Sequence, residues 1–225
     1  MDKIPILLLR IEGVLQSWGE RANWDRRDTA FTPTKSGVIG LIACAMGLER
    51  FDKRIAVMNS ELDFSVRVDR PGIILNDFQT VQGIIHTADG GVRGKKGEIG
   101  TIVSQRQYLQ DASFLVALTG EAIVLENCAS ALKAPKWQIY LGRKNCIPTR
   151  PIFEELTNQF ESVEEAFYNY PIAEGVDSKY LLYQIEGGEM LRRDDISSEK
   201  NRSFKLRGVN QKTMEVKNDS VENDA

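Results

Sequence analysis

The sequence contains few residues of the kinds that bind metals or form disulfides. Its 225 residues include three cysteines, Cys44, Cys128 and Cys146, and a single histidine, His86. The cysteines are widely spaced and form no Cys-x-x-Cys pair, so the sequence predicts neither a disulfide framework nor a structural zinc site. We expect no cofactor and no bound metal.

Long apolar runs are also missing. The run from Ile4 to Leu9 is short, contains Pro5 and is followed by Arg10 and Glu12. This pattern is typical of a buried strand and not of a signal peptide or a membrane span. The sequence therefore predicts a cytoplasmic protein without a membrane partner. With 42% hydrophobic residues, the chain can bury one substantial core and a small second domain.

A net charge of −3 argues against a general nucleic-acid binder, but the charges are segregated. The segment 153–175 holds six glutamates and no lysine or arginine, so the rest of the chain is net basic. Three basic clusters can form one phosphate-binding groove if the fold brings them together; otherwise they are unrelated solvated surfaces. The clusters are Arg21, Arg26, Arg27 and Lys35; Arg93, Lys95 and Lys96; and Arg143, Lys144 and Arg150.

The hydrophobic pattern predicts an α+β fold. We expect strands at 4–11, 62–68, 114–118 and 137–141, and helices at 35–46 and 121–132. The resulting order, βαββαβ, is the ferredoxin-like pattern of RNA-recognition domains. We assign residues 1–142 to this domain, 143–210 to a smaller, mainly β C-terminal domain, and 211–225 to a polar tail.

The connection between the second and third expected strands, 76–112, is too long for a simple hairpin. It is rich in glycine, carries Arg93, Lys95 and Lys96, and returns through Arg106 and Tyr108. This composition predicts a thumb-like arm that becomes ordered on RNA or on a neighbouring subunit. The alternative is a disordered surface loop.

A basic stretch precedes the first expected helix. Lys35, Ser36 and Gly37 would lie at its N-terminus, where free N–H groups and the helix dipole attract phosphate. The glycines of a P-loop are missing ahead of Lys35, so we do not expect ATP or GTP binding. In the alternative interpretation, Thr34 or Ser36 only caps the helix, while Gly37 and Gly40 allow it to approach the sheet.

Several short motifs occur in a specific order along the chain. They are Gly13–Gly19, Arg27–Thr29, Pro33–Gly37 and Gly142–Pro148. Together they resemble the CasD family of CRISPR-associated proteins, in the RAMP superfamily, and segments 79–81 and 108–114 resemble the two ends of that family's thumb. The resemblance covers about residues 6–209. Gln79 and Asn145 stand where the family often has His and Ser, which leaves the RNA sequence preference open.

The resemblance implies a non-catalytic subunit of a type I-E Cascade complex that holds the 5′ handle of the crRNA and caps the backbone of the complex. Its partners would be the crRNA, the adjacent backbone subunit and the large subunit that reads the protospacer-adjacent motif, with target DNA reached only through the complex. For base stacking we favour Trp18 and Tyr108, although a core position is an equal alternative for Trp18. The expected RNA contacts are Gln16, Trp18, Arg26, Arg27, Lys35, Ser36, Gly37, Arg93, Lys95, Lys96, Arg106, Tyr108, Arg143 and Lys144.

The alternative function is a metal-independent endoribonuclease that processes CRISPR repeat RNA. Some members of the wider superfamily cleave repeat RNA in this way, and His86 with Lys95, Lys96 and Tyr108 has the composition of such a site. The position of His86 on the arm argues against it, because catalysis requires a preorganised site.

The sequence favours two further functions less. Asp63, Asp69 and Asp77 lie near one expected strand, but their spacing separates them, and we interpret them as solvent-facing carboxylates and not as ligands of a metal-dependent nuclease. A site for another phosphorylated ligand would be revealed by competition from free nucleotides.

Overall fold

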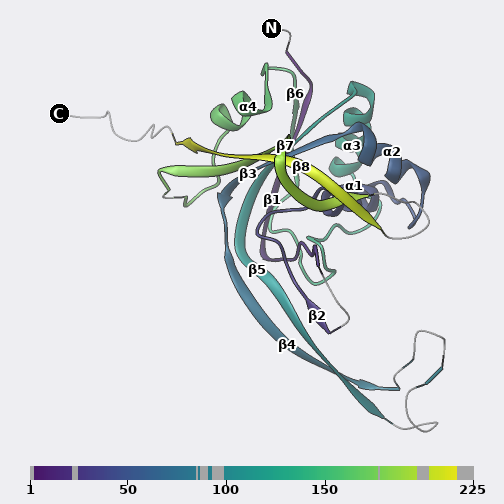
Figure 1. The fold of residues 1–225 in the computed structure, drawn as a ribbon. Helices are drawn as coiled ribbons and strands as arrows, with labels where there is room; N and C mark the ends of the chain where they lie inside the picture. Colours follow the sequence, from purple (N-terminus) through teal and green to yellow (C-terminus); the bar gives the residue numbers. More distant parts are fainter. Residues whose placement is uncertain are drawn as a thin grey trace.

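The computed structural model describes residues 3–21, 25–84, 86, 91–92, 99–176, 178–196 and 203–216. Within these residues the chain forms an α+β protein with four helices and a strongly curled, mainly antiparallel sheet (Figure 1). The α+β class expected from the hydrophobic pattern is confirmed. No helix in the described ranges is long and apolar enough to cross a membrane.

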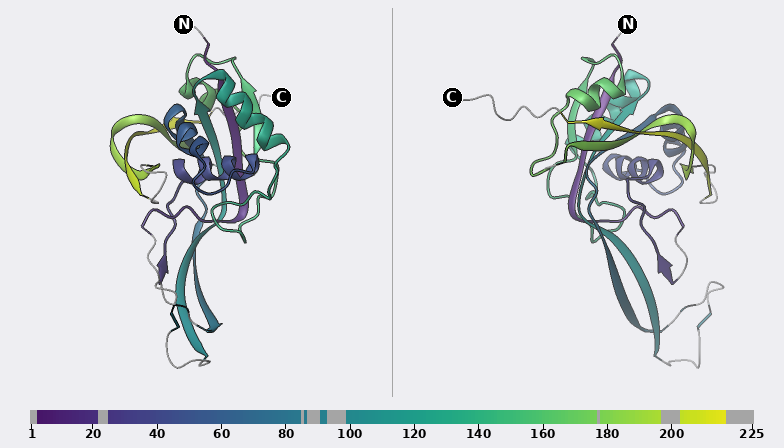
Figure 2. Two further views of the ribbon diagram at one scale, coloured as in Figure 1. Left: turned by 90° about the vertical axis from the view of Figure 1, so that its right-hand side faces the viewer. Right: turned by 60° about the vertical axis from the view of Figure 1, so that its left-hand side comes forward.

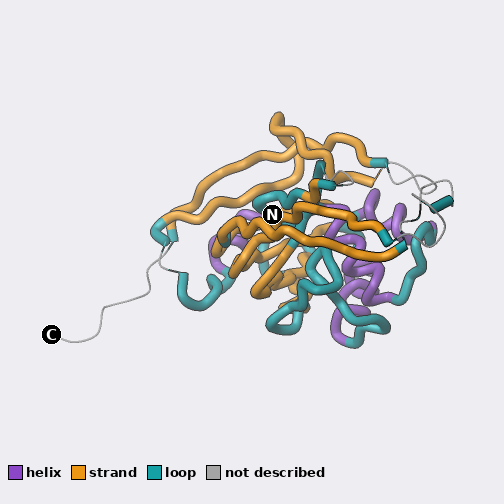
Figure 3. Tube along the Cα trace, turned by 90° about the horizontal axis from the view of Figure 1, so that it is seen from below, coloured by secondary structure: helices purple, strands orange, loops and turns teal. Residues whose placement is uncertain are grey.

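Four antiparallel strands form the centre of the sheet. In spatial order they are β6 (Phe153–Thr157), β1 (Ile6–Gln16), β5 (Gly100–Thr119) and β3 (Asp63–Arg70). Val116 of β5 pairs with Leu9 on one side and with Val66 on the other. Beyond β3 the sheet continues through β7 (Tyr180–Ile196) to β8 (Phe204–Glu215), and the strands bend around the helices (Figure 3).

Both faces of the central strands are buried, which explains the uninterrupted apolar run at the start of β1. On one face, Leu7 and Leu9 pack in a core with α1 (Lys35–Met46) and α3 (Ala122–Lys133). On the other face, Ile6 and Leu8 pack in a smaller core with α4 (Val163–Asn169). Helix α2 (Lys53–Glu61) packs against α1 and β7.

A two-stranded arm extends away from the body (Figures 1 and 2). It is formed by β4 (Ile73–Gly83) and the first half of β5, and it occupies the long connection at 76–112. Strand β2 (Arg26–Arg27) lies beside the arm as a short parallel partner of β5. Arg93, Lys95 and Lys96 lie outside the described residues, so their RNA contacts stay predictions.

The segment 137–141 is not the strand that we expected. The Leu141 N–H donates to the Cys146 carbonyl at 2.7 Å and the Leu141 carbonyl accepts from the Ser17 N–H at 3.0 Å, so these groups bond within loops and not in a sheet ladder. Strand β6 takes the place of the last central strand. The tail expected from residue 211 is also shorter, because β8 continues to Glu215. The separate domain at 143–210 stays a prediction.

Helix α1 begins and ends where the sequence predicts. The Thr34 hydroxyl caps it by accepting from the Gly37 N–H at 3.2 Å, and Gly47 ends it with a left-handed φ of 68°. A Cβ at Gly37 would lie 2.9 Å from the Trp18 ring, so this glycine does allow close packing. Gly40 does not: it is exposed on the solvent side of α1, and a Cβ there would meet no atom within 4 Å.

Candidate functional site

A basic hollow of about 330 Å³ lies between β2 and the arm. Arg26 and Arg27 are exposed there, and Asp28 is the one carboxylate among the described residues that line the hollow. Guanidinium groups bind phosphate oxygens through several parallel hydrogen bonds, so the hollow suits a phosphate group. Its lining residues are Arg21, Arg26, Arg27, Asp28, Asn76, Gln105 and Gln107.

Backbone hydrogen bonds hold β2 beside the arm. Arg26 pairs with Gln105, and Arg27 pairs with Arg106, in a short parallel ladder. The Gln105 N–H also donates to the Asp25 carbonyl at 2.8 Å. The positions of the two exposed arginines are therefore set by the main chain, and their side chains stay available for a ligand.

Arg143 joins the third basic cluster to the first. Its guanidinium carbon lies 4.5 Å from the centre of the Tyr108 ring, and its Nη2 donates to the Arg27 carbonyl at 3.0 Å. Its Nη1 is buried and has no hydrogen-bond partner in the described part of the chain. Asn145 donates to the Tyr108 hydroxyl at 3.3 Å, and Lys144 is exposed. Two of the three basic clusters thus meet in the fold.

Gly142 makes this arrangement possible. Its φ is 86°, in the left-handed region that favours glycine, and an added Cβ would lie 1.7 Å from the Ser17 carbonyl oxygen. No other residue can bring the loop this close to the end of β1. The glycine therefore sets where Arg143 emerges.

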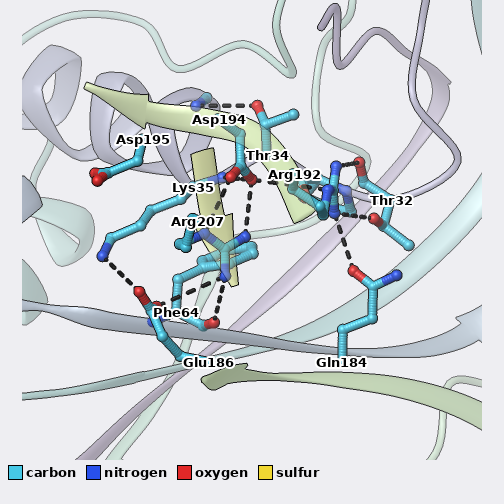
Figure 4. A network of polar contacts seen from close by, with 12 residues as sticks. Thr32, Thr34, Lys35, Phe64, Gln184, Glu186, Arg192, Asp194, Asp195 and Arg207 are labelled. Carbon is cyan, nitrogen blue, oxygen red and sulfur yellow. Dashed lines mark hydrogen bonds and ion pairs between the residues drawn. The ribbon is translucent and has the colours of Figure 1, made fainter. Parts of the chain in front are cut away.

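The start of α1 already holds an anion from the same chain (Figure 4). The Asp194 carboxylate accepts from the Lys35 N–H at 2.9 Å and from Arg207 at 2.8 and 3.0 Å. The Lys35 ammonium group donates to Glu186 at 3.1 Å, and its side chain is only 6% exposed. Carboxylates of β7 therefore occupy the position where we expected a phosphate.

The Asp194 carboxyl group stays charged in this network. Burial by itself raises its pKa, but the hydrogen bonds and charge of Arg207, together with a second arginine and the Lys35 N–H, outweigh burial and lower the pKa below its usual value. The Lys35 N–H and ammonium group are therefore not open to a phosphate in this conformation, and an RNA contact of Lys35 requires this network to open. Ser36 and Gly37 are half-buried and line a separate hollow of about 290 Å³. The RNA contacts of all three residues stay predictions.

A second contact of β7 holds the loop that carries β2. Arg192 donates to Glu20 at 2.9 Å, to the Thr32 hydroxyl at 2.5 Å and to Gln184 at 3.0 Å. The last two contacts are visible in Figure 4. Glu20 and Thr32, which lie on either side of β2 in the sequence, are thus both held by the same residue of β7.

A family model described as CRISPR-associated protein (Cas_Cas5) matches residues 6–216. The chain belongs to the Cas5 family of CRISPR-associated proteins. The Escherichia coli (strain K12) protein named CRISPR system Cascade subunit CasD is 36% identical over 174 residues, which span 73% of this chain and 76% of that protein. The family resemblance inferred from the short motifs is confirmed.

Two solved structures are similar to this Cas5 protein. A chain of a structure titled CRISPR RNA-guided surveillance complex has a TM-score of 0.75 and 35% identity, and the match covers 94% of this chain and 90% of that chain. A structure titled Crystal structure of Cas protein has a TM-score of 0.71 and 34% identity, with coverages of 93% and 95%. The likeness therefore extends over nearly the whole fold.

Three of the expected RNA contacts lie in the core of this Cas5 protein. Gln16 is fully buried, and Trp18 and Tyr108 are each 1% exposed. The Trp18 indole N–H donates to Gln16 at 3.0 Å, and Gln16 donates to the Ala112 carbonyl at 2.8 Å. Neither ring offers an open face to a base in this conformation, and Trp18 occupies the core position that the sequence left as the alternative. The RNA contacts of Gln16, Trp18 and Tyr108 stay predictions.

Arg106 is half-buried on the arm. It lies opposite Asp77 in the β4–β5 ladder, and its Nε donates to the Ser104 hydroxyl at 3.3 Å. Its place in the ladder puts it directly beside Arg27. Its contact with RNA stays a prediction.

The rival catalytic residues are not assembled among the described residues. His86 is exposed and forms an isolated bridge with Val92, while Lys95 and Lys96 lie outside the described residues. The interpretation of Asp69 as a solvent-facing carboxylate is wrong. It is 2% exposed and forms buried ion pairs with Arg10 and Arg67, because those guanidinium groups compensate the cost of burying its charge.

Sequence reasoning missed the neutral residues of the basic hollow. Asn76, Gln105 and Gln107 come from the two strands of the arm, and Gln107 donates to Asn76 at 3.0 Å across the ladder. Alternation of polar residues along an expected strand would have indicated a common face. Only the register of β4 against β5 shows that this face meets β2.

Proposed function

We propose that this Cas5 protein is the CasD subunit of a type I-E Cascade surveillance complex and that it holds the 5′ handle of the crRNA without cleaving it. The observation that carries the proposal is the junction at Arg143, which contacts Tyr108 and Arg27 beside a hollow lined by three arginines. Clustered cations next to half-buried polar groups are what the backbone of single-stranded RNA requires.

The sheet supports a ferredoxin-like core of the RAMP type. The four central strands follow the spatial order fourth, first, third, second, and α1 and α3 connect the strands on one face. This is the split βαβ arrangement of RNA-recognition domains. The arm is the thumb of this fold in our proposal, and β7 with β8 represents the smaller C-terminal region.

In the proposed mode, exposed cations bind handle phosphates. Arg26 and Arg27 contact the backbone in the basic hollow, and the Arg143 guanidinium group, held against the Arg27 carbonyl, adds its charge beside them. Lys144 extends the positive surface on the next residue. Phosphate contacts fix the path of the RNA, whereas bases are distinguished by stacking and by contacts with their edges.

The proposed partners are those that the family resemblance implies. We propose that the arm contacts the adjacent backbone subunit, that the body contacts the large subunit that reads the protospacer-adjacent motif, and that target DNA is reached only through the assembled complex in the cytoplasm. Residues of the arm with large exposed apolar side chains support a protein contact. They include Ile73, Phe78, Val81 and Val103.

A non-catalytic role is supported by the composition of the hollow. Among the described residues that line it, Asp28 is the single carboxylate and accepts from the Arg21 backbone N–H at 3.0 Å, and none is a histidine. A hollow built in this way binds phosphate but offers no acid–base pair for attack by a 2′-hydroxyl group.

The test is binding of 5′-labelled repeat RNA to the full-length protein in chelator, across a series of salt concentrations. We expect uncut, bound RNA, and weaker binding for Arg26→Ala/Arg27→Ala, with the slope of log affinity against log salt reduced by about 0.7 for each lost phosphate contact. The matched control Lys53→Ala/Lys179→Ala removes two exposed cations outside the hollow and should change neither quantity. Equal binding by both double variants would refute the proposal, and shortened RNA that depends on His86 would establish the ribonuclease.

A further inference from the structure

A second hollow, of about 440 Å³, contains two aromatic side chains and one cation. It is lined by Cys44, Trp137, Gln138, Tyr140 and Lys144. Trp137 is 47% exposed, in contrast to the buried rings of Trp18 and Tyr108. An indole ring that is about half exposed to solvent and lies in a concave surface is available for stacking on a flat ligand.

We propose that this aromatic hollow binds one unpaired base of the guide RNA, with Trp137 as the stacking platform and Lys144 beside the adjoining phosphate. The inference rests on the proposed function and assigns a base-binding subsite to it. Gln138 supplies an amide donor and an amide acceptor among the lining residues, which are the groups that hydrogen-bond to a base edge.

The walls of the aromatic hollow are fixed before any ligand binds. On one side of Trp137, the Lys136 N–H donates to the Ala45 carbonyl at 2.8 Å. On the other side, the Gln138 carbonyl accepts from the Cys44 thiol at 3.4 Å. Both bonds attach the loop to α1, so a base that enters the hollow does not need to order the loop, which lowers the entropic cost of binding.

Two neighbouring residues link the aromatic hollow to the basic site. Lys144, which lines the aromatic hollow, directly follows Arg143, and Arg143 donates to the Arg27 carbonyl at the edge of the basic hollow. RNA held by its phosphates near Arg27 would meet Lys144 next along this loop. This adjacency favours a base of the same RNA over the side chain of a protein partner as the occupant.

The test compares Trp137→Ala and Trp137→Phe with the wild-type full-length protein in binding to repeat RNA and to a series of RNAs with one abasic nucleotide each. We expect Trp137→Ala to lower affinity about 5- to 150-fold and Trp137→Phe to retain most of it, because stacking needs a ring and not an indole in particular. The salt slope should stay unchanged, since no phosphate contact is removed. One RNA of the abasic series should bind more weakly to the wild-type protein and should bind Trp137→Ala with the same affinity as the intact RNA does.

The other outcomes overturn the inference. Wild-type affinity for Trp137→Ala would exclude a stacking role. Normal RNA binding with loss of assembly into Cascade would instead make the aromatic hollow a protein-docking site. If Arg26→Ala/Arg27→Ala weakens binding while Trp137→Ala does not, only this inference fails; if the wild-type protein binds no RNA, the proposed function fails with it. Thermal melting of Trp137→Ala, which should be close to wild type for a half-exposed side chain, controls for folding.

Discussion

Replacing Gly142 by alanine is expected to destabilise the protein and to disturb the RNA site at the same time. The new Cβ would lie 1.7 Å from the Ser17 carbonyl oxygen, and the backbone φ of 86° is unfavourable for any residue with a side chain. The left-handed conformation costs about 1–2 kcal/mol. Displacing a packed loop to relieve the overlap costs about 1–3 kcal/mol more.

The sum, about 2–5 kcal/mol, is a large part of the stability of an ordinary domain. For a chain of this length it corresponds to a decrease in melting temperature of about 4–20 °C. The measurement is urea unfolding followed by circular dichroism, combined with RNA binding of the folded fraction. Because Arg143 is the next residue, we expect RNA affinity to fall even where the variant is folded.

Gly40→Ala is the matched control. The same methyl group is added, but Gly40 lies in the middle of α1 on its exposed side, and the methyl group meets no atom within 4 Å. Alanine is favoured over glycine in a helix, so this variant should be more stable by about 0.5–1 kcal/mol. If the two variants shift the free energy of unfolding in the same direction, our account of the close contact between Gly142 and Ser17 is wrong.

Three further outcomes are expected. Asp69→Ala should lower the free energy of unfolding in urea by about 3–5 kcal/mol, because Arg10 and Arg67 stay buried without a carboxylate; a loss below about 1 kcal/mol, the value of an exposed pair, would contradict this. The lowered pKa of Asp194 contributes stability above about pH 4, and this contribution is lost as pH falls through the folded-state pKa. Below about pH 4 the free energy of unfolding of the wild type should therefore fall more steeply with pH than that of Asp194→Asn. Equal slopes of this free energy against pH would refute the assignment. Burial raises the pKa of the Cys128 thiol to about 11, so at pH 8 a thiol reagent should modify it far more slowly in the native protein than in urea, and similar rates would show that the thiol is accessible.

The sequence determined the local elements well. Helix α1 was predicted with its bounds, because Thr34 and Gly47 are strong end signals and the segment between them is apolar. The two-face burial of β1 followed from an apolar run without alternation. The motif at Gly142–Pro148 marked the loop whose Arg143 contacts Arg27 and Tyr108. The strand at 137–141 was predicted wrongly, because its apolar pattern does not reveal that Leu141 bonds to Cys146 and Ser17.

The tertiary structure decided which charges are available to a ligand. Lys35 and Arg27 belong to one basic cluster in the sequence, yet Lys35 is paired with Glu186 from β7 while Arg27 stays exposed beside Arg143. Likewise only the fold shows that the Trp18 side chain is buried in the core and that the Trp137 side chain is about half exposed to solvent. Local pattern fixes backbone conformation, but solvent exposure and ion pairing depend on partners more than a hundred residues away, and the sheet register brings these partners together.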